Sequence, residues 1–381
     1  MKLKNNEVFF AKIAKKKAQK FIKLVKKNYS KRIILHNKYK IVEDNHYIFF
    51  PLKISPDEIN ELRKKIGPLL EIEIIKLKAE KRENYEHRTL EEALKGQISK
   101  KYYELIPHSY DIIGDIAIIE FRNNEKMKKK RKIKKKIAKA ILQINKNVKS
   151  VYEKKSKVRG AFRIREMNHL AGLRKTETLH KENNCIFRLD IKRTFFTPRL
   201  NHERLLVSKS NIEKGERIVD LFAGVGTFSV QIAKLHDVKI YAFDINPYAY
   251  KYLKKNIKIN NLKGRIVPFN INVKKLINSP NQIEIKLRNK IDRIIMNFPE
   301  DSLRFLDVVC NLIKEEGGII HNYQFSEKPN SIRKAVAKFR NKIEIYDFIL
   351  KEIKRSDIIK SYSPKSDMIV IDALIQKLNP S

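Results

Sequence analysis

The stretch RIVDLFAGVGTFSVQIAKLHDVKIYAFDIN, residues 217–246, decides the fold of this chain. A β-branched run ends at Asp220, and after a glycine-bearing loop the amphipathic segment Thr227–Lys234 is typical of a helix. A second apolar run, Val238–Phe243, ends at the acidic Asp244. The pattern predicts a βαβ unit with glycines at its first strand-to-helix turn and an acid at the tip of its second strand.

The loop and its two acids indicate a cofactor site. Gly224 and Gly226 let a ligand approach backbone that a Cβ would block, beside a helix N-terminus. Asp244, at the carboxyl end of a strand, can accept both hydroxyls of a ribose. The loop reads D-x-F-x-G-x-G, unlike the dinucleotide G-x-G-x-x-G, and its leading acid, Asp220, suits the charged amino-acid end of S-adenosylmethionine. The alternative is a purely structural turn.

Composition indicates a polyanionic partner. The chain has 381 residues, enough for two or three domains, and carries 84 Lys and Arg against 43 Asp and Glu. A lysine- and isoleucine-rich genome accounts for part of this excess. A net charge of +41 on one chain nevertheless favours a nucleic-acid partner over a merely solvated surface.

Two cysteines, Cys185 and Cys310, argue against a disulfide framework and a Cys-rich metal site, so we expect no bound metal. No apolar run reaches the ~18 residues that a membrane span requires. Residues 1–27 lack the apolar core and cleavage site of a secretory signal. We therefore expect a soluble, cytoplasmic protein that does not bind membranes.

Three domains are predicted: 1–78, 79–182 and 183–381. The first is a small α/β module, with a basic helix over 9–28, strands near 32–35, 46–52 and 70–75, and a helix over 56–66 capped by Ser55. The second is an α+β domain with a strand over 116–121 and a helix over 137–144. The basic run KMKKKRKIKKK, residues 126–136, precedes that helix, and we interpret it as a phosphate contact rather than a solvated helix face. From Ile218 onward, alternating strands and helices predict a mostly parallel sheet covered on both faces.

A fourth strand of this sheet, 292–296, ends in Asn297-Phe298-Pro299-Glu300. An Asn-x-Pro at such an edge places a rigid amide in the crevice where α/β sheets bind ligands, although in most proteins it is only a turn. The amide offers a donor and an acceptor to a nucleobase, and Pro299 fixes the turn. The order D-x-F-x-G-x-G, D-I-N-P, N-F-P-E is typical of class I methyltransferases that act on exocyclic or ring nitrogens.

Between residues 151 and 201 the pattern predicts alternating strands, including VRGAFRIRE and KRTFFTPRL. Arg163 and Arg165, two residues apart on an extended segment, are expected to share one face. Arg199 is expected in a turn, and Glu203 at the start of a helix. A simple ion pair between Arg199 and Glu203 is the alternative to a role in catalysis.

Over essentially its whole length the sequence resembles the archaeal and eukaryotic type of tRNA (guanine-37 N1)-methyltransferase. The matching stretches are IPHSYDIIGDIAIIE, HKENN, FTPRLNHER, DLFAGVGTFSV, DINPYA, DRIIMNFPE, GGIIHNYQF and KSYSP. FTPRLNHER and MNFPE are the most diagnostic. The resemblance implies a small N-terminal recognition domain, a middle domain and a C-terminal Rossmann-like class I methyltransferase domain. It also implies S-adenosylmethionine as the methyl donor and a monomer that binds tRNA.

The resemblance assigns roles in the reaction. Guanine N1 carries a proton that must leave as the methyl group arrives, so a general base is needed, with a donor for charge on O6. Glu203 matches the family's base, and Arg163 matches the arginine that holds O6, with Arg165 as the alternative. Asn297 and Pro299 match residues that hold the target base.

The resemblance also implies residues for the cofactor and for tRNA. Those expected at the cofactor are Phe195, Arg199, Asp220, Phe222, Gly224, Gly226, Asp244, Ile245, Asn272 and Asn297. Those expected at the substrate are Arg163, Arg165, Arg199, Asn246 and Pro299. Phe195 stands where many relatives have Tyr, and Asn272 where an acid is usual, so we expect weaker cofactor contact.

Two other functions stay open. A wyosine-pathway transferase would move an aminocarboxypropyl group from the same cofactor or methylate a wyosine intermediate, but the intact Asn-x-Pro argues against aminocarboxypropyl transfer. A catalytically silent tRNA-binding scaffold would not need Asp220, Asp244, Glu203 and Asn297 together. No cysteine lies in N-F-P-E, so we expect direct in-line attack on the methyl carbon.

Overall fold

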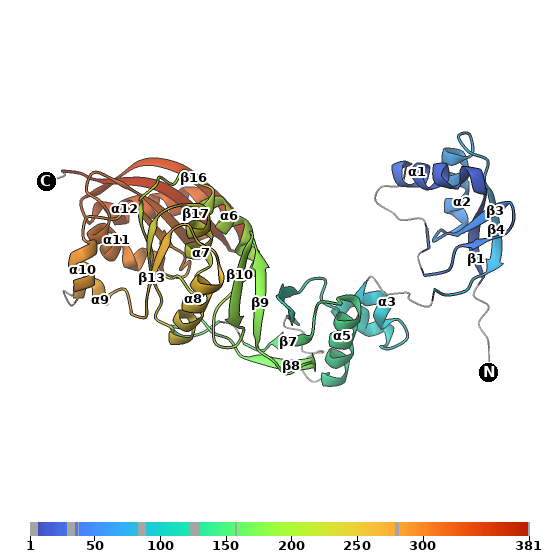
Figure 1. Cartoon of the computed structure of the whole chain (residues 1–381), viewed down its shortest axis with the longest axis horizontal. Helices are drawn as coiled ribbons and strands as arrows, with labels where there is room; N and C mark the ends of the chain where they lie inside the picture. Colours follow the sequence, from blue (N-terminus) through green and yellow to red (C-terminus); the bar gives the residue numbers. More distant parts are fainter. Residues whose placement is uncertain are drawn as a thin grey trace. The chain divides into compact units, whose positions relative to one another are not determined.

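The computed structural model describes residues 7–28, 35–36, 38–82, 89–121, 130–156, 158–278 and 282–379. The chain forms two compact units, Met1–Ala93 and Leu94–Ser381 (Figure 1). Among the helices of the described part, none is both long and apolar enough to cross a membrane.

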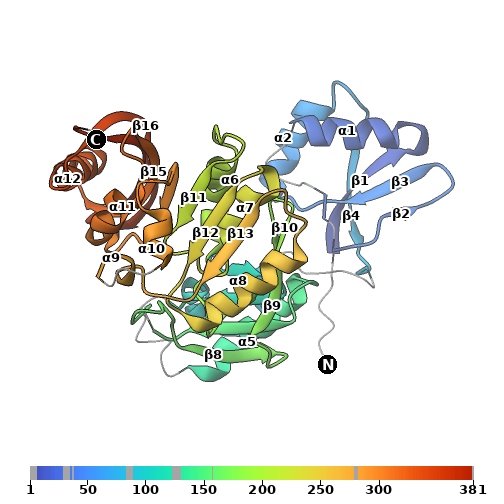
Figure 2. The ribbon, with the colours of Figure 1, turned by 60° about the vertical axis from the view of Figure 1, so that its left-hand side comes forward.

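The first unit is a four-stranded sheet covered by two helices. Its strands, in the spatial order β2-β3-β1-β4, are β1 (Glu7–Ala14), β2 (Val42–Glu43), β3 (Tyr47–Pro51) and β4 (Glu73–Lys78). The helices are α1 (Ala18–Asn28) and α2 (Pro56–Ile66). Both pack on one face of the sheet, where Phe21 of α1 and Leu62 of α2 share a core with Phe50 of β3 (Figure 2).

The helix predicted over 56–66 is confirmed. The Ser55 hydroxyl accepts from the backbone N–H of Glu58, and the Glu58 carboxylate accepts from that of Ser55, so the two residues form a capping box. The helix predicted over 9–28 is wrong in its first half, because Glu7–Ala14 is a strand paired on both sides. Pairing with β3 and β4 outweighs the helix propensity of its Lys and Ala residues. Residues 32–34 lie outside the described part.

The second unit begins with a four-stranded sheet of spatial order β5-β6-β7-β8. Helix α3 (Leu90–Leu94) spans the boundary between the two units. The elements that follow are η2 (Lys100–Leu105), β5 (Asp111–Ile113), β6 (Ile116–Ile119), α5 (Arg131–Ile144), β7 (Ser150–Lys154) and β8 (Met167–Gly172). Helix α5 crosses between the parallel strands β6 and β7, burying Ile137 and Ile141.

Helix α5 starts six residues earlier than predicted and contains the end of the basic run. Residues 126–129 of that run lie outside the described part. Lys134 does not face solvent or RNA: it is buried and forms an ion pair with Glu153 of β7. The interpretation of the whole run as a phosphate contact is therefore wrong for this lysine.

A hairpin of β9 (Glu177–Glu182) and β10 (Cys185–Asp190) follows, and then η3 (Pro198–Leu200) and α6 (Asn201–Ser208). The expected domain boundary at 182/183 falls at the turn of this hairpin, and the three-domain division remains a proposal. The strand predicted for KRTFFTPRL is wrong. The Asp190 carboxylate accepts the backbone N–H groups of Lys192 and Arg193, which turns the chain after β10.

The remainder is a seven-stranded sheet of spatial order β13-β12-β11-β14-β15-β17-β16, parallel except for pairs that involve β17. Its strands are β11 (Arg217–Asp220), β12 (Lys239–Phe243), β13 (Arg265–Phe269), β14 (Arg293–Met296), β15 (Gly318–Glu327), β16 (Phe348–Ser363) and β17 (Ser366–Lys377). Its helices are α7 (Thr227–Leu235), α8 (Pro247–Ile259), α9 (Lys275–Asn278), α10 (Gln282–Leu287), η4 (Ser302–Phe305), α11 (Leu306–Leu312) and α12 (Ser331–Glu344).

Separate cores fill the two faces of this sheet. Helices α7 and α8 pack on one face with β10, while α11 and α12 pack on the other. The expected Rossmann-like α/β fold is confirmed. Because β11, β12 and β14 are parallel neighbours, the loops that follow them meet at one edge of the sheet.

Gly226 provides a test of this packing. It has φ +91°, and a Cβ there would lie 2.5 Å from Leu253 Cδ1 of α8. We expect Gly226→Ala to lower the free energy of unfolding by about 2–4 kcal/mol, the sum of left-handed strain and overpacking. Gly215→Ala is the matched control, because Gly215 has φ +85° with no atom within 4 Å of its Cβ position. Urea unfolding would contradict the packing argument if both variants lost equal stability.

Candidate active site

Three predicted residues lie at neighbouring strand ends. Asp220 ends β11, Asp244 follows β12 and Asn297 follows β14. Two of these side chains have a buried oxygen, Asp220 Oδ1 and Asn297 Oδ1, with no hydrogen-bond partner among the described residues. A buried polar atom without a partner costs about 1–3 kcal/mol, so such atoms at a strand-end crevice indicate a place for ligand donors.

Asp220 is fully buried. Its Oδ2 accepts a 2.7 Å hydrogen bond from the Ser229 hydroxyl at the start of α7, which leaves Oδ1 for a ligand. Burial raises the pKa of Asp220 to about 7, against the opposing effect of this hydrogen bond. A positive charge brought to Oδ1 would favour the ionised carboxylate.

Asp244 binds the cofactor loop itself. It accepts from the backbone N–H of Gly224 at 2.8 Å and of Asn246 at 2.7 Å. Burial raises the pKa of Asp244 to about 6, and these two donors oppose the shift. Gly224 has φ +57° and no atom near its Cβ position, so one side of the loop is open.

The other residues expected at the cofactor have mixed surroundings. Ile245 is 39% exposed, whereas Asn246 is buried, caps α8 and donates to the Arg193 carbonyl. Asn272 is exposed, and its Oδ1 accepts from the Lys274 N–H. Phe222 packs against other aromatic rings, with centroids 5.1 Å from Phe298 and 4.9 Å from Phe305.

Arg163 lies in a tight turn rather than on an extended segment. Its N–H donates to the Gly160 carbonyl at 3.0 Å, and Arg159 forms an isolated bridge with Ile164. Gly160 has φ +69° and Arg163 φ +53°, conformations that reverse the chain. The prediction that Arg163 and Arg165 share one face of a strand is therefore wrong.

The Arg163 guanidinium lies beside the N-F-P-E loop. It is 5.1 Å from the ring centroid of Phe195 and 5.2 Å from that of Phe298, and its Nη1 is 3.1 Å from a Glu300 oxygen. Burial lowers the pKa of Arg163, while the Glu300 charge opposes this shift. Arg165 lines a separate hollow. Arg163 is thus the arginine that lies near Asn297 and Pro299 in the described structure.

Arg199 and Glu203 do not pair with each other, so the simple ion pair considered from the sequence is wrong. Arg199 Nε donates to Asp111 of β5 at 2.9 Å. Glu203, in the first turn of α6 as predicted, is 7% exposed. Its carboxylate accepts from Arg355 Nη2 of β16 at 2.7 Å.

The half-buried Arg355 begins a chain of otherwise buried charged groups that the sequence did not reveal. It also donates to Asp372 at 2.8 Å, and Asp372 lies 2.7 Å from His321 Nδ1. His321 Nε2 lies 2.9 Å from the Arg293 guanidinium. Because arginine only donates, Nε2 must accept and Nδ1–H must donate to Asp372. Burial would raise the pKa of Asp372, but His321 and Arg355 together hold it below its ordinary value.

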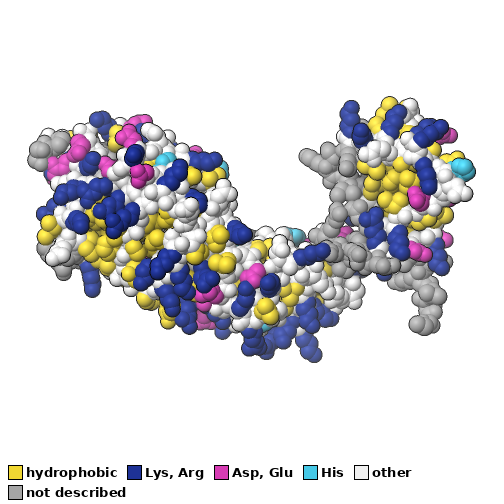
Figure 3. All heavy atoms as spheres, in the orientation of Figure 1, with side chains coloured by type: hydrophobic (Ala, Val, Ile, Leu, Met, Phe, Trp, Pro, Cys, Tyr) yellow, Lys and Arg dark blue, Asp and Glu magenta, His cyan; other side chains and the backbone are white. Residues whose placement is uncertain are grey.

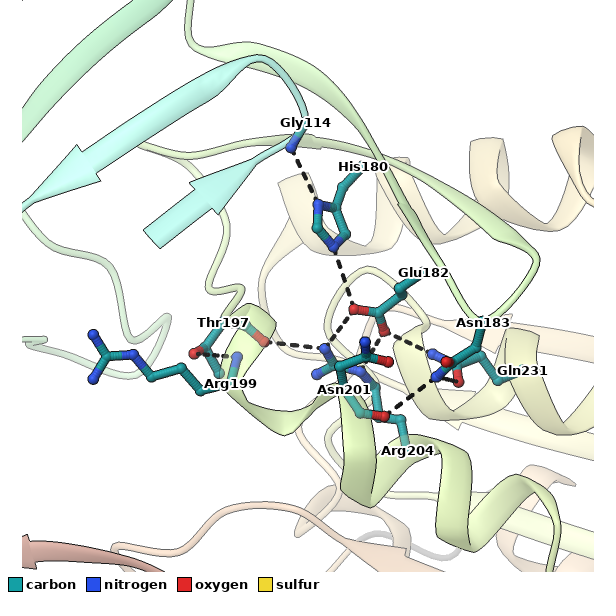
Figure 4. Close-up of polar contacts among 9 residues, drawn as sticks. All are labelled: Gly114, His180, Glu182, Asn183, Thr197, Arg199, Asn201, Arg204 and Gln231. Atoms are coloured by element: carbon teal, nitrogen blue, oxygen red, sulfur yellow. Dashed lines mark hydrogen bonds and ion pairs between the residues drawn. The ribbon is translucent and has the colours of Figure 1, made fainter. Parts of the chain in front are cut away.

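Glu182 is the centre of a polar network that gives the HKENN stretch, residues 180–184, a structural role (Figure 4). This buried carboxylate accepts from Arg204 of α6 at 2.5 and 2.8 Å and from Gln231 of α7 at 2.7 Å. His180 Nε2 approaches it at 3.4 Å, while His180 Nδ1 accepts from the Gly114 N–H. The network therefore ties β9, α6 and α7 to the β5–β6 turn.

Lys360 of β16 was also missed. It belongs to the matching stretch KSYSP, which was the only sequence signal for it. Burial lowers the pKa of Lys360, with a further contribution from the nearby charges of Arg199 and Arg163. Lys360 is therefore a half-buried cation whose charge acts together with those of Arg199 and Arg163. In the described part of the chain no group of His, Cys, Asp and Glu side chains is arranged to hold a metal ion.

Comparisons with known proteins show which family the chain resembles. Residues 178–351 match the TRM5/TYW2 methyltransferase domain, and residues 90–176 match the TYW2 N-terminal domain. The tRNA (guanine(37)-N(1))-methyltransferase Trm5b of Methanocaldococcus jannaschii is 33% identical over 345 residues, covering 90% of this chain and 93% of that protein. The tRNA(Phe) (4-demethylwyosine(37)-C(7)) aminocarboxypropyltransferase of the same organism is 30% identical over 276 residues, covering 71% and 98%.

A solved structure is similar over nearly the whole chain. The complex structure of aTrm5 and tRNALeu has a TM-score of 0.70 and 32% identity, and the match covers 96% of this chain and 99% of that one.

The raised pKa of Asp220 predicts a pH dependence. A buried acid with a raised pKa stabilises the empty protein at low pH, and this contribution is lost as pH rises through about 7. The ammonium group of S-adenosylmethionine favours the ionised form, so binding should release a proton. We expect affinity to rise about tenfold between pH 5.5 and 7, measured by calorimetry in buffers of different ionisation enthalpy. The assignment is contradicted if the cofactor affinity of Asp220→Asn rises with pH as steeply as that of wild type.

The Glu182 network predicts a large stability effect. We expect Glu182→Gln to cost about 3–5 kcal/mol in urea unfolding, because it leaves the buried Arg204 without a counter-charge. Glu120→Gln is the control, because the Glu120 side chain is 58% exposed and its ion pair with Lys154 should contribute under about 1 kcal/mol. Equal losses in the two variants would show that burial of the pair does not matter.

Proposed function

Because the chain belongs to the TRM5/TYW2 methyltransferase family, as its motifs predicted, we propose that it transfers the methyl group of S-adenosylmethionine to N1 of guanosine 37 in tRNA. The observation that carries this proposal is the pairing of a donor with an acceptor at the target-base site. Arg163 is a donor, and Asn297 Oδ1 is a buried acceptor without a partner in the described structure. Guanine presents an acceptor, O6, beside the donors N1–H and N2–H, which matches this arrangement. Adenine has the donor N6–H in place of O6, and this donor would face Arg163, which can only donate.

The cofactor supplies the electrophilic methyl group, and the chain supplies its position. We assign Asp220 Oδ1 to the ammonium group, Asp244 to the ribose hydroxyls and the exposed Ile245 to the adenine face. Gly224 lets the amino-acid end approach the open side of the loop. Alignment of the methyl group with N1 accounts for most of the rate enhancement in such a transfer.

Glu203 is the base in this proposal. Its charge is among those that act on Tyr323, whose buried hydroxyl has no partner in the described structure. Tyr323 follows Asn322, the strand partner of Met296, so this tyrosine lies beside the strand end that carries Asn297. Arg355 also holds the Glu203 carboxylate, in an ion pair of 2.7 Å. Glu203 would accept the N1 proton while Arg163 balances charge on O6.

The substrate is tRNA, which the net charge of +41 suits. Lys and Arg side chains are frequent on the visible face of Leu94–Ser381 (Figure 3). Arg199 and Lys360 would contact the tRNA near the target base. We also propose that the protein acts as a monomer in the cytoplasm, with Met1–Ala93 as a tRNA-recognition module.

That first unit also bears on the wyosine alternative. The aminocarboxypropyltransferase matches over 98% of its own length but only 71% of this chain. The match to the TYW2 N-terminal domain begins at residue 90, just before the end of the first unit at Ala93. The additional unit therefore favours methylation of guanosine 37 over aminocarboxypropyl transfer.

The test uses labelled S-adenosylmethionine and unmodified tRNA transcripts with guanosine or adenosine at position 37. We expect methyl label in the guanosine transcript alone, recovered as 1-methylguanosine. Transfer of label from the aminocarboxypropyl carbons would identify the wyosine reaction instead. Tight binding of cofactor and tRNA without any transfer would indicate a silent scaffold.

Glu203→Gln tests the base. The variant keeps the shape of the side chain but cannot accept a proton, so turnover should fall about 100-fold or more while cofactor affinity is retained. Glu213→Gln, a change at an exposed residue near the end of the loop after α6, should behave as wild type. Single-turnover kinetics that are unchanged in Glu203→Gln would remove Glu203 from the mechanism.

A further inference from the structure

A basic hollow of about 500 Å³ lies beside the Arg163 turn. Three of its lining residues are the cations Arg159, Arg165 and Lys192, and neutral Asn168 adds a polar side chain. Arg159 and Arg165 flank the turn that carries Arg163, while Lys192 follows strand β10. Two separate segments of the chain therefore supply positive charge to one concave surface.

The three cations have no counter-charge of their own in the described structure. The acidic residue of the hollow, Glu166, forms an ion pair at 3.3 Å with Lys155. No ion pair joins Arg159, Arg165 or Lys192 to an acid within the described ranges. A concave site with unbalanced positive charge attracts an anion.

The position of the hollow indicates which anion. Arg163, on the same turn, is the residue that our proposed function assigns to O6 of the target guanine. The base and the phosphates of a nucleotide are covalently linked, so a base held by Arg163 brings its own phosphodiesters close to residues 159–165. Phe162, at the tip of the turn, is 40% exposed and Ile164 is 37% exposed. Exposed aromatic rings interleaved with arginines are typical of surfaces that bind single-stranded RNA.

We propose that the basic hollow binds one of the two phosphodiesters that flank the target nucleotide. Arg159 and Arg165 would be its main ligands, with Lys192 adding charge from a separate segment of the chain. This assignment rests on the proposed function for the identity of the RNA. It gives Arg165 a role distinct from that of Arg163: Arg163 contacts the base, and Arg165 fixes the backbone from which the base is turned out.

A phosphate contact has a defined signature. It positions the RNA without reading sequence, so its loss weakens binding of all tRNA substrates and reduces the salt dependence of binding. Cofactor affinity and the preference for guanosine should not change.

The experiment uses the full-length protein and tRNA assembled by ligation, with a neutral methylphosphonate at the 5′ or the 3′ phosphodiester of guanosine 37. We expect one of these two substitutions to weaken tRNA binding by wild type about tenfold, measured by fluorescence anisotropy with S-adenosylhomocysteine present. The double variant Arg159→Gln/Arg165→Gln should bind unmodified tRNA with the same loss and should no longer distinguish the modified tRNA. Its salt slope should fall by about one, as expected for the loss of one phosphate contact.

Lys209→Gln is the matched control, because Lys209 is an exposed cation at the C-terminus of α6 outside the hollow. It should distinguish the methylphosphonate as wild type does. Cofactor affinity of the double variant reports whether it is folded. The proposal is overturned if neither methylphosphonate affects wild type, or if the double variant remains as sensitive as wild type. Because binding is measured, a wild type that transfers no methyl group would refute the proposed function without changing this readout.

Discussion

The buried ion pair between Glu182 and Arg204 is the interaction on which the rest of the site depends. An ionised carboxylate in a protein interior is costly unless it is paired, and here Arg204, Gln231 and His180 all contact that of Glu182. These partners come from α6, α7 and β9. Since α6 also carries Glu203, the orientation of the proposed base is set by a pair that takes no part in the chemistry.

A second, largely buried network contacts the Glu203 carboxylate. Arg355 bridges Glu203 and Asp372, and His321 contacts Asp372 from β15. Arg204 thus fixes helix α6, which carries the proposed base, and Arg355 of β16 fixes the carboxylate of that base. Each network satisfies charges that would be costly alone, so neither end can relax without exposing an unpaired buried charge.

Local sequence signals predicted the parts of the fold that depend on local interactions. The cap at Ser55 joins residues three positions apart, and the glycine loop and the acids at strand ends each lie next to the strand that predicts them. The strand Glu7–Ala14 was missed because its partners lie far along the chain. The ion pairs of Glu182 and of Arg355 were missed because each joins residues far apart in the sequence. In addition, an isolated charged residue forms no periodic pattern. Gly160 was read as part of a strand, although its left-handed conformation creates the turn that presents Arg163.

The backbone conformation of Arg163 lowers the stability of the fold, while its side chain has a proposed role in the reaction. Six non-glycine residues of the described chain have positive φ, and apart from Arg163 they are Asn or Asp, which tolerate this region best: Asn183, Asn184, Asn289, Asn330 and Asp347. Holding an arginine there costs about 1 kcal/mol that glycine would not. Directed evolution for heat resistance would therefore favour Gly or Asn at this position. Selection for methyl transfer would keep Arg, so the two screens should enrich opposite residues at one codon.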